Sequence, residues 1–252
     1  MPKTRRVAVI TGSSSGIGRA IALRLLRSGY SVMLNYSADD VRAASALAEC
    51  RRVDSAVALV KADVSNPHDV SDLMQQTIDA FGRIDVLVNN AARVIDKPAL
   101  EMTENEWDRV VSVNLKGAFL CSQHAARQMM KQDDGGVILN IGASTGLRGR
   151  RNGVNTCASK AGLMVMTQCL ALEFAPKIRV NTIIPGLIVT EETERRFQLN
   201  DIAVRRTRED TVPLQRLGQP ADVGDAVILM LTDQARFITG QKLVVDGGQN
   251  MW

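Results

Sequence analysis

The stretch Thr11-Gly12-Ser13-Ser14-Ser15-Gly16-Ile17-Gly18 decides the fold, because it joins an apolar run directly to an amphipathic one. The preceding run, Val7 to Ile10, has the length of a buried strand, and the residues after the stretch have helical spacing. Its glycines let the main chain turn tightly and approach a pyrophosphate, whose charge is attracted by the free N–H groups of a helix start. Glycines also serve ordinary turns, but their position between a strand and a helix indicates dinucleotide binding.

Outward from this turn, apolar runs of strand length alternate with amphipathic helical stretches along the chain. The runs are nearly continuous in hydrophobic residues, which is typical of parallel strands covered on both faces. Strands that alternate with helices predict an α/β fold with a doubly wound, mainly parallel sheet and helices on both of its faces. The runs expected to form strands are Val7 to Ile10, Ser31 to Asn35, Ala56 to Val60, Ile84 to Val88, Val137 to Ile141, Arg179 to Ile183 and Lys242 to Val245.

The length of 252 residues fits one large α/β domain, and the sequence contains no linker, repeat or low-complexity tract. We therefore expect a single dinucleotide-binding Rossmann domain over residues 1–252. The least periodic part, at about 187–213, is rich in charged residues. We expect this segment to form an irregular excursion above the sheet, on the substrate side.

The composition, with 45% hydrophobic and 23% charged residues, is typical of an ordinary globular protein. The net charge of +4 is modest, and the arginine-rich stretches have acidic neighbours, so nucleic acid is not an expected partner. Apolar runs fall short of the roughly 20 residues that span a bilayer, and the N-terminal residues leave no room for a signal peptide. A cytoplasmic protein without a membrane partner is therefore expected. The four cysteines and two histidines are scattered, which predicts no metal site.

Five further motifs follow the glycine-rich turn: Asn89-Asn90-Ala91, Asn114-Leu115-Lys116-Gly117, Ala158-Ser159-Lys160-Ala161-Gly162, Pro185-Gly186 and Val245-Asp246-Gly247-Gly248. In this order they resemble the motifs of short-chain dehydrogenases/reductases, and the resemblance covers essentially the whole chain. It implies a seven-stranded Rossmann sheet, a nicotinamide dinucleotide cofactor and a small-molecule substrate. It also implies a homotetramer, with a dimer as the alternative. Within the family the chain resembles 3-oxoacyl-acyl-carrier-protein reductases and their sugar- and steroid-dehydrogenase relatives.

The resemblance implies cofactor-binding residues along the whole length of the chain. Asp63 and Val64 would flank the adenine, and Pro185 with the residues that follow it would hold the carboxamide end of the nicotinamide. The family usually has glycine where this chain has Ala92, whose methyl group would crowd the adenosine ribose. The expected set is Gly12, Ser14, Ser15, Gly16, Ile17, Gly18, Asn35, Tyr36, Ser37, Asp63, Val64, Asn90, Ala91, Ala92, Ile141, Lys160, Pro185, Gly186, Ile188 and Thr190.

The end of the second expected strand, Asn35-Tyr36-Ser37, bears on the choice of cofactor. An acidic residue there would bind the ribose 2′-hydroxyl and repel a 2′-phosphate. None is present, and Asn35, Ser37 and Ser14 offer neutral hydrogen bonds. NADP(H) is therefore favoured, while NAD(H) stays open because no basic residue stands at Ser37.

The resemblance also identifies the catalytic positions. In the family, a Tyr in Tyr-x-x-x-Lys donates a proton to the substrate oxygen and a Ser holds that oxygen. The Lys binds the nicotinamide ribose and lowers the pKa of the Tyr, and an Asn holds a water that links the Lys to solvent. Here Lys160 and Asn114 are present, but Thr156 stands at the Tyr position. Alignment without a gap puts Ala143 at the Ser position, whereas a slip of one residue would put Ser144 there.

An alkyl hydroxyl is a far weaker acid than a phenol, whose pKa is about 10, so Thr156 is a poor substitute for a Tyr. Three functions then stay open. The favoured one is an NADP(H)-dependent oxidoreductase that acts on a carbonyl or enoyl substrate with a non-standard proton donor. The others are a cofactor-binding protein without redox turnover, serving as a regulatory or partner subunit, and a non-redox enzyme in which Lys160 acts on the substrate.

The loop between Ala143 and Thr156 contains Arg148, Arg150 and Arg151, near the expected entrance for substrate. These arginines have the chemistry to bind a phosphate, coenzyme A or a carboxylate. A solvated basic loop without a ligand explains them equally well, so both interpretations stay open.

Overall fold

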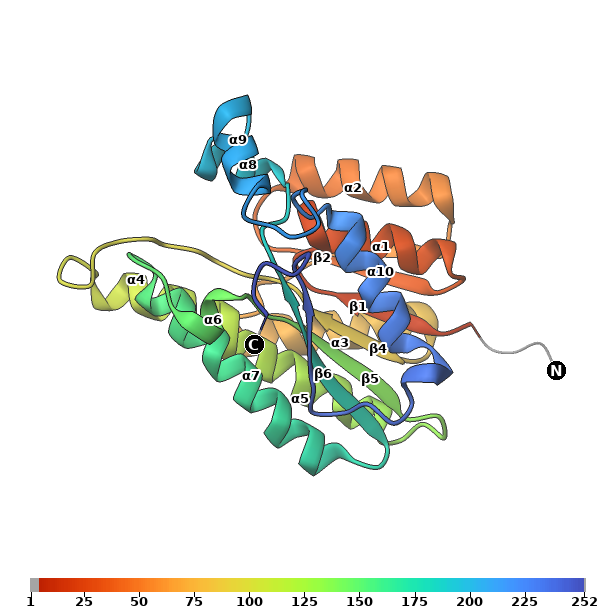
Figure 1. Cartoon of the computed structure of the whole chain (residues 1–252). Coiled ribbons are helices and arrows are strands. Elements are labelled where there is room, and N and C mark those ends of the chain that lie inside the picture. Colours follow the sequence, from red (N-terminus) through yellow and green to blue (C-terminus); the bar gives the residue numbers. More distant parts are fainter. Residues whose placement is uncertain (1–4, 252) are drawn as a thin grey trace.

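The computed structural model describes residues 5–251. Residues 1–4 and 252 lie outside the described residues. The expectation of a cytoplasmic protein rests in part on these N-terminal residues, which the structure therefore does not cover. Within the described part, the chain forms one sheet of seven parallel strands with helices on both faces, a Rossmann-like α/β fold (Figure 1). The strand order is β3-β2-β1-β4-β5-β6-β7. The predicted doubly wound sheet is confirmed.

Each expected strand is present, and some of its ends are shifted by one or two residues. Strands β1 and β4 are buried over their whole length, as strands covered on both faces must be. The strands are β1 (Val7–Ile10), β2 (Ser31–Tyr36), β3 (Val57–Lys61), β4 (Val86–Asn89), β5 (Gly136–Ile141), β6 (Ile178–Pro185) and β7 (Lys242–Val245).

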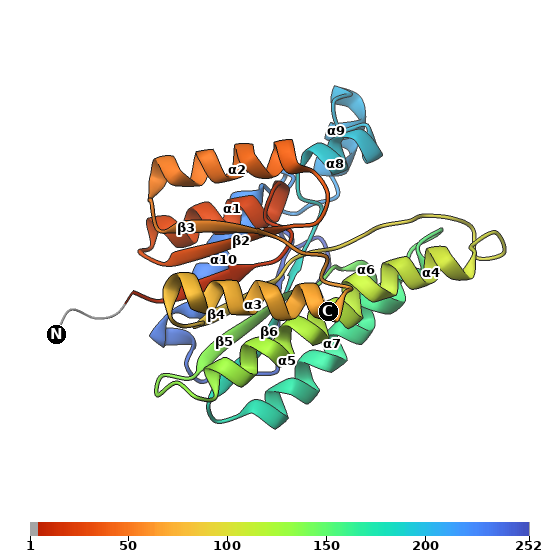
Figure 2. The same cartoon turned by 180° about the vertical axis from the view of Figure 1, so that it is seen from behind.

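Two hydrophobic cores lie on opposite faces of the sheet, because successive strand residues point to opposite sides. Ala8 and Ile10 of β1 pack into one core, and Val9 packs into the other. The first core is covered by α1 (Gly16–Arg27), α2 (Asp40–Val53) and α10 (Pro220–Leu231), and the second by α3 (Pro67–Phe81), α5 (Ala118–Met129) and α7 (Val154–Phe174) (Figures 1 and 2).

The remaining helices lie mainly at the edge formed by the carboxyl ends of the strands (Figure 1). They are α4 (Glu104–Val111), the π-helical turn η1 (Ser112–Gly117), α6 (Thr145–Arg148), α8 (Glu191–Phe197) and α9 (Ile202–Glu209), while the 3-10 turn η2 (Asp233–Ala235) precedes β7. In the described residues, no helix has both the length and the apolar character needed to cross a bilayer.

The segment 187–213 was expected to be an irregular excursion above the sheet, and it differs from this expectation in containing helices. It contains α8 and α9, two short helices that project beyond the layers of the sheet (Figure 1). Thr190 caps α8 through a reciprocal pair of hydrogen bonds with Thr193, and Asp201 caps α9. Neither helix has a buried residue. The sequence of this segment therefore lacks the apolar periodicity by which longer helices are predicted.

Candidate functional site

The glycine-rich turn joins β1 to α1, and its glycines have different surroundings. A Cβ atom on Gly12 would lie 2.8 Å from the Cα atom of Ala91, and one on Gly18 would lie 2.5 Å from the carbonyl oxygen of Gly12. Gly12 and Gly18 therefore permit close packing inside the protein. Gly16 has a φ of +52°, and a Cβ atom there would meet only the side chain of Thr190, at 3.4 Å. Gly16 thus faces the gap between the turn and the start of α8.

The N-terminus of α1 has the features of an anion site. Ser15 precedes the helix, but its side chain makes no capping hydrogen bond, and the first turn contains no acidic residue. The peptide N–H groups at this end carry the positive end of the helix dipole and lack partners within the helix. A pyrophosphate fits this donor set, with Gly16 leaving room for its approach.

Residues at the end of β4 hold the turn in place. The side-chain nitrogen of Asn90 donates to the carbonyl oxygens of Thr11 (3.0 Å) and Gly12 (2.9 Å). The hydroxyl oxygen of Thr11 accepts hydrogen bonds from the main-chain N–H groups of Asn90 and Ala91, both at 3.0 Å. Ala92 follows and is exposed. Asn90 and Ala91 thus support the turn as well as lying at the expected path of a cofactor.

Asn35 at the end of β2 also supports the turn. Its amide oxygen accepts from the N–H of Gly12 at 3.1 Å, and its amide nitrogen donates to the carbonyl of Ala62 at 3.0 Å. Asn35 is buried, so its amide is engaged by the main chain. The hydroxyl groups expected beside it belong to Ser37, which is exposed, and Ser14, which is half-buried.

The neighbouring side chains at this edge form a charged group on the surface. Tyr36 donates its hydroxyl to Asp40 at 2.8 Å, and Lys61 donates to the same carboxylate at 2.9 Å. These two hydrogen bonds, that of Lys61 foremost, lower the pKa of Asp40. The hydrogen bond to Asp40 raises the pKa of Tyr36. The carboxylate that contacts Tyr36 at this end of β2 is therefore already paired with a cation.

The expected adenine and nicotinamide residues lie at the same edge of the sheet. Asp63 and Val64 follow β3, with Asp63 exposed and Val64 buried against Gly117. Pro185 ends β6, and a Cβ atom on Gly186 would lie 2.6 Å from the Cβ atom of Asp246, so glycine is needed there. Two more expected residues continue this segment: Ile188 is buried, and Thr190 begins α8.

Lys160 lies on α7 and reaches the end of β5. Its Nζ atom donates to the carbonyl oxygen of Ile141 at 2.6 Å, and its side chain is buried. Burial disfavours the charged ammonium and lowers the pKa of Lys160 to about 8. The structure thus brings together Lys160 and Ile141, two residues from the expected set.

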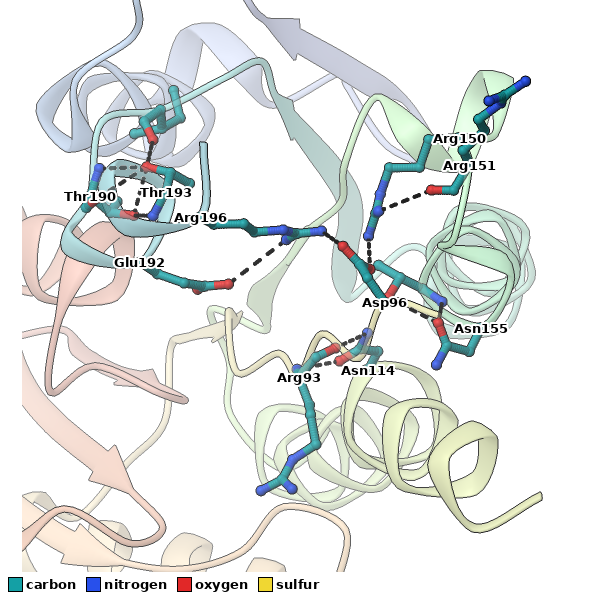
Figure 3. Close-up of polar contacts among 12 residues, drawn as sticks. Arg93, Asp96, Asn114, Arg150, Arg151, Asn155, Thr190, Glu192, Thr193 and Arg196 are labelled. Carbon is teal, nitrogen blue, oxygen red and sulfur yellow. Dashed lines mark hydrogen bonds and ion pairs between the residues drawn. The ribbon is translucent and has the colours of Figure 1, made fainter. Parts of the chain in front are cut away.

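Asn114 lies in η1, a π-helical turn between α4 and α5. Its amide oxygen accepts from the N–H of Arg93 at 2.7 Å, and its amide nitrogen donates to the carbonyl of Arg93 at 3.0 Å (Figure 3). The same nitrogen donates to the hydroxyl of Ser159 at 3.2 Å. Buried Asn114 therefore ties the chain after β4 to α7, and π-helical turns of this kind are frequent at functional sites.

Thr156 lies four residues before Lys160 on α7, so the two residues are one helical turn apart. Its hydroxyl donates to the amide oxygen of Asn155 at 3.3 Å, and its N–H donates to the same oxygen at 2.6 Å. The amide nitrogen of Asn155 donates to the carbonyl of Ile95 at 3.1 Å. Ala143 is half-buried between β5 and α6, and the adjacent Ser144 immediately precedes α6.

The sequence did not reveal an ion cluster that lies beside Asn155. The carboxylate of Asp96 pairs with the guanidinium groups of both Arg150 and Arg196 (Figure 3). These residues come from the chain after β4, the loop before α7, and α8. The arginine-rich loop was the single signal of this cluster, because its members are widely separated in the sequence.

Within residues 5–251, no group of three or more His, Cys, Asp or Glu side chains is arranged to hold a metal ion. The residues that the sequence singled out lie instead along the carboxyl edge of the sheet, from the glycine-rich turn to Thr190. The N-terminus of α1 offers donors suited to an anion, and a buried lysine and a buried asparagine, Lys160 and Asn114, also belong to this set.

The chain is similar to known proteins over almost its whole length. A family model described as enoyl-(acyl carrier protein) reductase matches residues 12–250. The chain is 36% identical over 250 residues to a 3-oxoacyl-[acyl-carrier-protein] reductase of Staphylococcus aureus, and this match covers 99% of this chain and 100% of the relative. It is 38% identical over 251 residues to a 3-oxoacyl-[acyl-carrier-protein] reductase of Synechocystis, and this match covers 99% of this chain and 98% of the relative. A crystal structure of a proposed gluconate dehydrogenase from Agrobacterium tumefaciens matches with a TM-score of 0.90 and 30% identity, over 97% of this chain and 95% of that one.

Proposed function

This chain belongs to the short-chain dehydrogenase/reductase family, and on that premise we propose that it is an NADP(H)-dependent oxidoreductase with a non-standard proton donor. Its proposed substrate is a small molecule with a carbonyl or enoyl group. The observation that carries the proposal is an edge of the sheet where cofactor-binding groups, Lys160 and Asn114 occur together, while Thr156 and Ala143 stand at the two remaining catalytic positions. A nicotinamide cofactor supplies or accepts a hydride in this family.

The proposed cofactor site uses the N-terminus of α1 for the pyrophosphate, Lys160 for the nicotinamide ribose, and the segment from Pro185 to Thr190 for the nicotinamide. The proposed preference for NADP(H), which has a 2′-phosphate, is supported by the uncharged residues Asn35, Tyr36 and Ser37 at the end of β2. Beyond that end, Asp39 caps α2 and faces Arg42 at 3.3 Å, and Asp40 is paired with Lys61. Since these carboxylates are paired with cations, they repel a phosphate less than free carboxylates would.

The proposal that Thr156 does not serve as the proton donor is supported by the hydrogen bond of its hydroxyl group. The hydroxyl hydrogen of Thr156 is donated to the amide oxygen of Asn155. Ala143 has no hydroxyl with which to hold a substrate oxygen. We therefore assign proton donation to a water molecule or to a group on the substrate itself, with Lys160 and Asn114 retained as supports of the cofactor site.

Two other functions are supported by particular observations. The engaged hydroxyl of Thr156 also suits a protein that binds the cofactor without turnover, as a regulatory or partner subunit. The lowered pKa of about 8 gives Lys160 a larger neutral fraction at neutral pH than an ordinary lysine has, which suits a non-redox reaction in which its amine acts on the substrate.

Cofactor titration followed by a substrate screen separates these functions. NADPH and NADH are titrated by fluorescence, and the loaded protein is then offered ketones and enoyl thioesters while the absorbance of the reduced nicotinamide is followed. The proposal predicts that NADPH binds about tenfold more tightly than NADH, a difference of about 1.4 kcal/mol. It also predicts slow oxidation of NADPH by at least one substrate. Tight binding without any turnover favours the cofactor-binding protein, and equal affinities or tighter NADH contradict the assignment of NADP(H).

A further inference from the structure

The ion cluster of Asp96, Arg150 and Arg196 has the geometry of an occupied carboxylate site. Nη2 of Arg150 meets Oδ1 of Asp96, and Nη2 of Arg196 meets Oδ2 of the same carboxylate. The two guanidinium groups therefore approach from different sides and converge on one carboxylate (Figure 3). Arginine pairs arranged in this way are suited to binding planar anions, because each guanidinium presents several N–H groups in a fixed plane.

The cluster contains more positive than negative charge. Two guanidinium groups, with side chains 24% and 25% exposed, share one carboxylate. Glu192 is the next acidic group, but its Oε1 atom is 3.9 Å from Nη1 of Arg196 and its side chain is 60% exposed, so water weakens this pair. The second terminal nitrogen of the Arg150 guanidinium, Nη1, donates only a 3.4 Å hydrogen bond to the carbonyl of Arg151. The site thus attracts a further anion.

The members of the cluster come from segments that adjoin the catalytic positions or the proposed nicotinamide segment. Asp96 follows Ile95, whose carbonyl accepts a hydrogen bond from Asn155, the residue before Thr156. Arg150 belongs to the loop that connects Ala143 to Thr156, and Arg196 belongs to α8, the helix that follows the proposed nicotinamide segment. These links place the cluster beside the stretch that contains Thr156, toward which the proposed substrate approaches.

We propose that Arg150 and Arg196 bind a carboxylate group of the substrate, and that Asp96 holds this site in the absence of substrate. The inference rests on the proposed function, because the substrate must approach Thr156 and Ala143. Exchange costs little in electrostatic terms, since the guanidinium groups trade one carboxylate for another and Asp96, already 28% exposed, returns to water. The substrate class is accordingly an oxo or enoyl acid rather than a neutral ketone.

The test compares acids with their neutral esters. Acetoacetate and levulinate are titrated against the full chain saturated with NADPH, beside methyl acetoacetate and methyl levulinate, and binding is followed by the fluorescence of bound NADPH and by thermal shift. The expected result is that the acids bind about tenfold more tightly than the esters, as a charge-assisted pair of hydrogen bonds allows. Arg150→Gln and Arg196→Gln should each abolish this preference.

Matched variants distinguish a specific site from general positive charge. Arg151→Gln and Arg195→Gln remove one positive charge from the same loop and the same helix, at exposed positions, and should keep the preference for acids. Asp96→Asn removes the resident carboxylate and should raise the affinity for the acids severalfold without changing that for the esters. This last variant retains both arginines, so it tests the proposal even if an arginine variant fails to fold.

Equal affinities for acids and esters in the natural protein would overturn the proposal. So would an equal loss of preference in the two control variants, or weaker binding of acids by Asp96→Asn. If NADPH itself fails to bind, the proposed function fails separately. The preference of the cofactor-free protein for acids, measured by thermal shift, then decides whether the carboxylate site exists.

Discussion

Gly16 and Gly18 are two residues apart, yet a side chain would meet different surroundings at the two positions. At Gly16 a Cβ atom meets only the Thr190 side chain, whereas at Gly18 it would overlap the main chain. Gly16→Val should therefore fold with reduced stability, because φ is positive there, and should lose NADPH binding because the branched side chain blocks the pyrophosphate. Gly18→Ala should instead destabilise the fold itself. Circular dichroism and NADPH titration check both, and undiminished affinity in folded Gly16→Val would contradict the placement of the site.

Lys160 is expected to make the stability of the protein depend on pH. Its pKa is about 8 in the native state and near the ordinary 10.5 in the unfolded chain, so between these values the unfolded state binds more protons. The free energy of unfolding contributed by this group then rises with pH, and the penalty of burying its charge is fully present only below pH 8. The shift from 10.5 to about 8 corresponds to about 3 kcal/mol.

Lys160→Met removes this titration. We expect its stability relative to the natural protein to fall by up to about 3 kcal/mol as pH rises from about 8 to 10.5, because only the natural protein gains stability in that range. Urea unfolding at both pH values measures the difference. Lys131→Met, at an exposed position, is the control and should show no such change. A pH-independent difference for Lys160→Met would show that the buried amine does not titrate in this window.

At the scale of elements, Asn114 is one of the residues that link the helical run from α4 through η1 to α5 with α7, and it also joins this run to the chain after β4. Asn114→Ala removes three hydrogen bonds and leaves the main-chain groups of Arg93 without their partners. We expect a loss of about 2 kcal/mol in the free energy of unfolding, because the buried Asn114 side chain loses three hydrogen bonds and the part-buried main-chain groups of Arg93 lose their partners. Asn200→Ala, at an exposed position, is the control for urea unfolding. Equal stabilities of the two variants would contradict the structural role of Asn114.

Helix α8 lies between the two ends of the proposed cofactor site. Glu191, at its start, is 3.5 Å from Arg42 of α2, on the adenosine side. Arg196, near its end, pairs with Asp96 on the substrate side. The helix is therefore connected to both sides by ion pairs, although it has no buried residue of its own.

The sequence predicted some elements well because their cause is local. Strands such as Val7–Ile10 are short runs of apolar residues, because a strand that is buried on both faces needs apolar side chains on both. The glycine-rich turn marks the end of β1. Helices α8 and α9 were missed because capping by Thr190 and Asp201, rather than apolar periodicity, defines them. The Asp96 cluster depends on two loops and helix α8, which meet only in the folded chain, so no spacing in the sequence could reveal it.

At the scale of the whole molecule, exposed apolar side chains support the proposal of a single-domain protomer that assembles into a tetramer. Phe119 on α5 and Val165 and Leu172 on α7 are large and exposed, and Val165 and Leu172 are two helical turns apart on one face. We expect a tetramer in sedimentation velocity, and a smaller species for the double variant Val165→Glu with Leu172→Glu. Leu100→Glu, exposed on a different segment, should not change the assembly. A natural protein that sediments as a monomer would contradict the proposal.

We propose that the protein retains the cofactor site of its family but lacks the usual proton donor and oxyanion support. The most direct test is the double variant Ala143→Ser with Thr156→Tyr, compared with the natural protein for reduction of activated ketones at equal NADPH saturation. We predict that the natural protein reduces them very slowly and that the double variant gains roughly 10²-fold or more, the usual contribution of a positioned general acid. Ordinary rates in the natural protein, or no gain in a double variant that binds NADPH normally, would contradict the account.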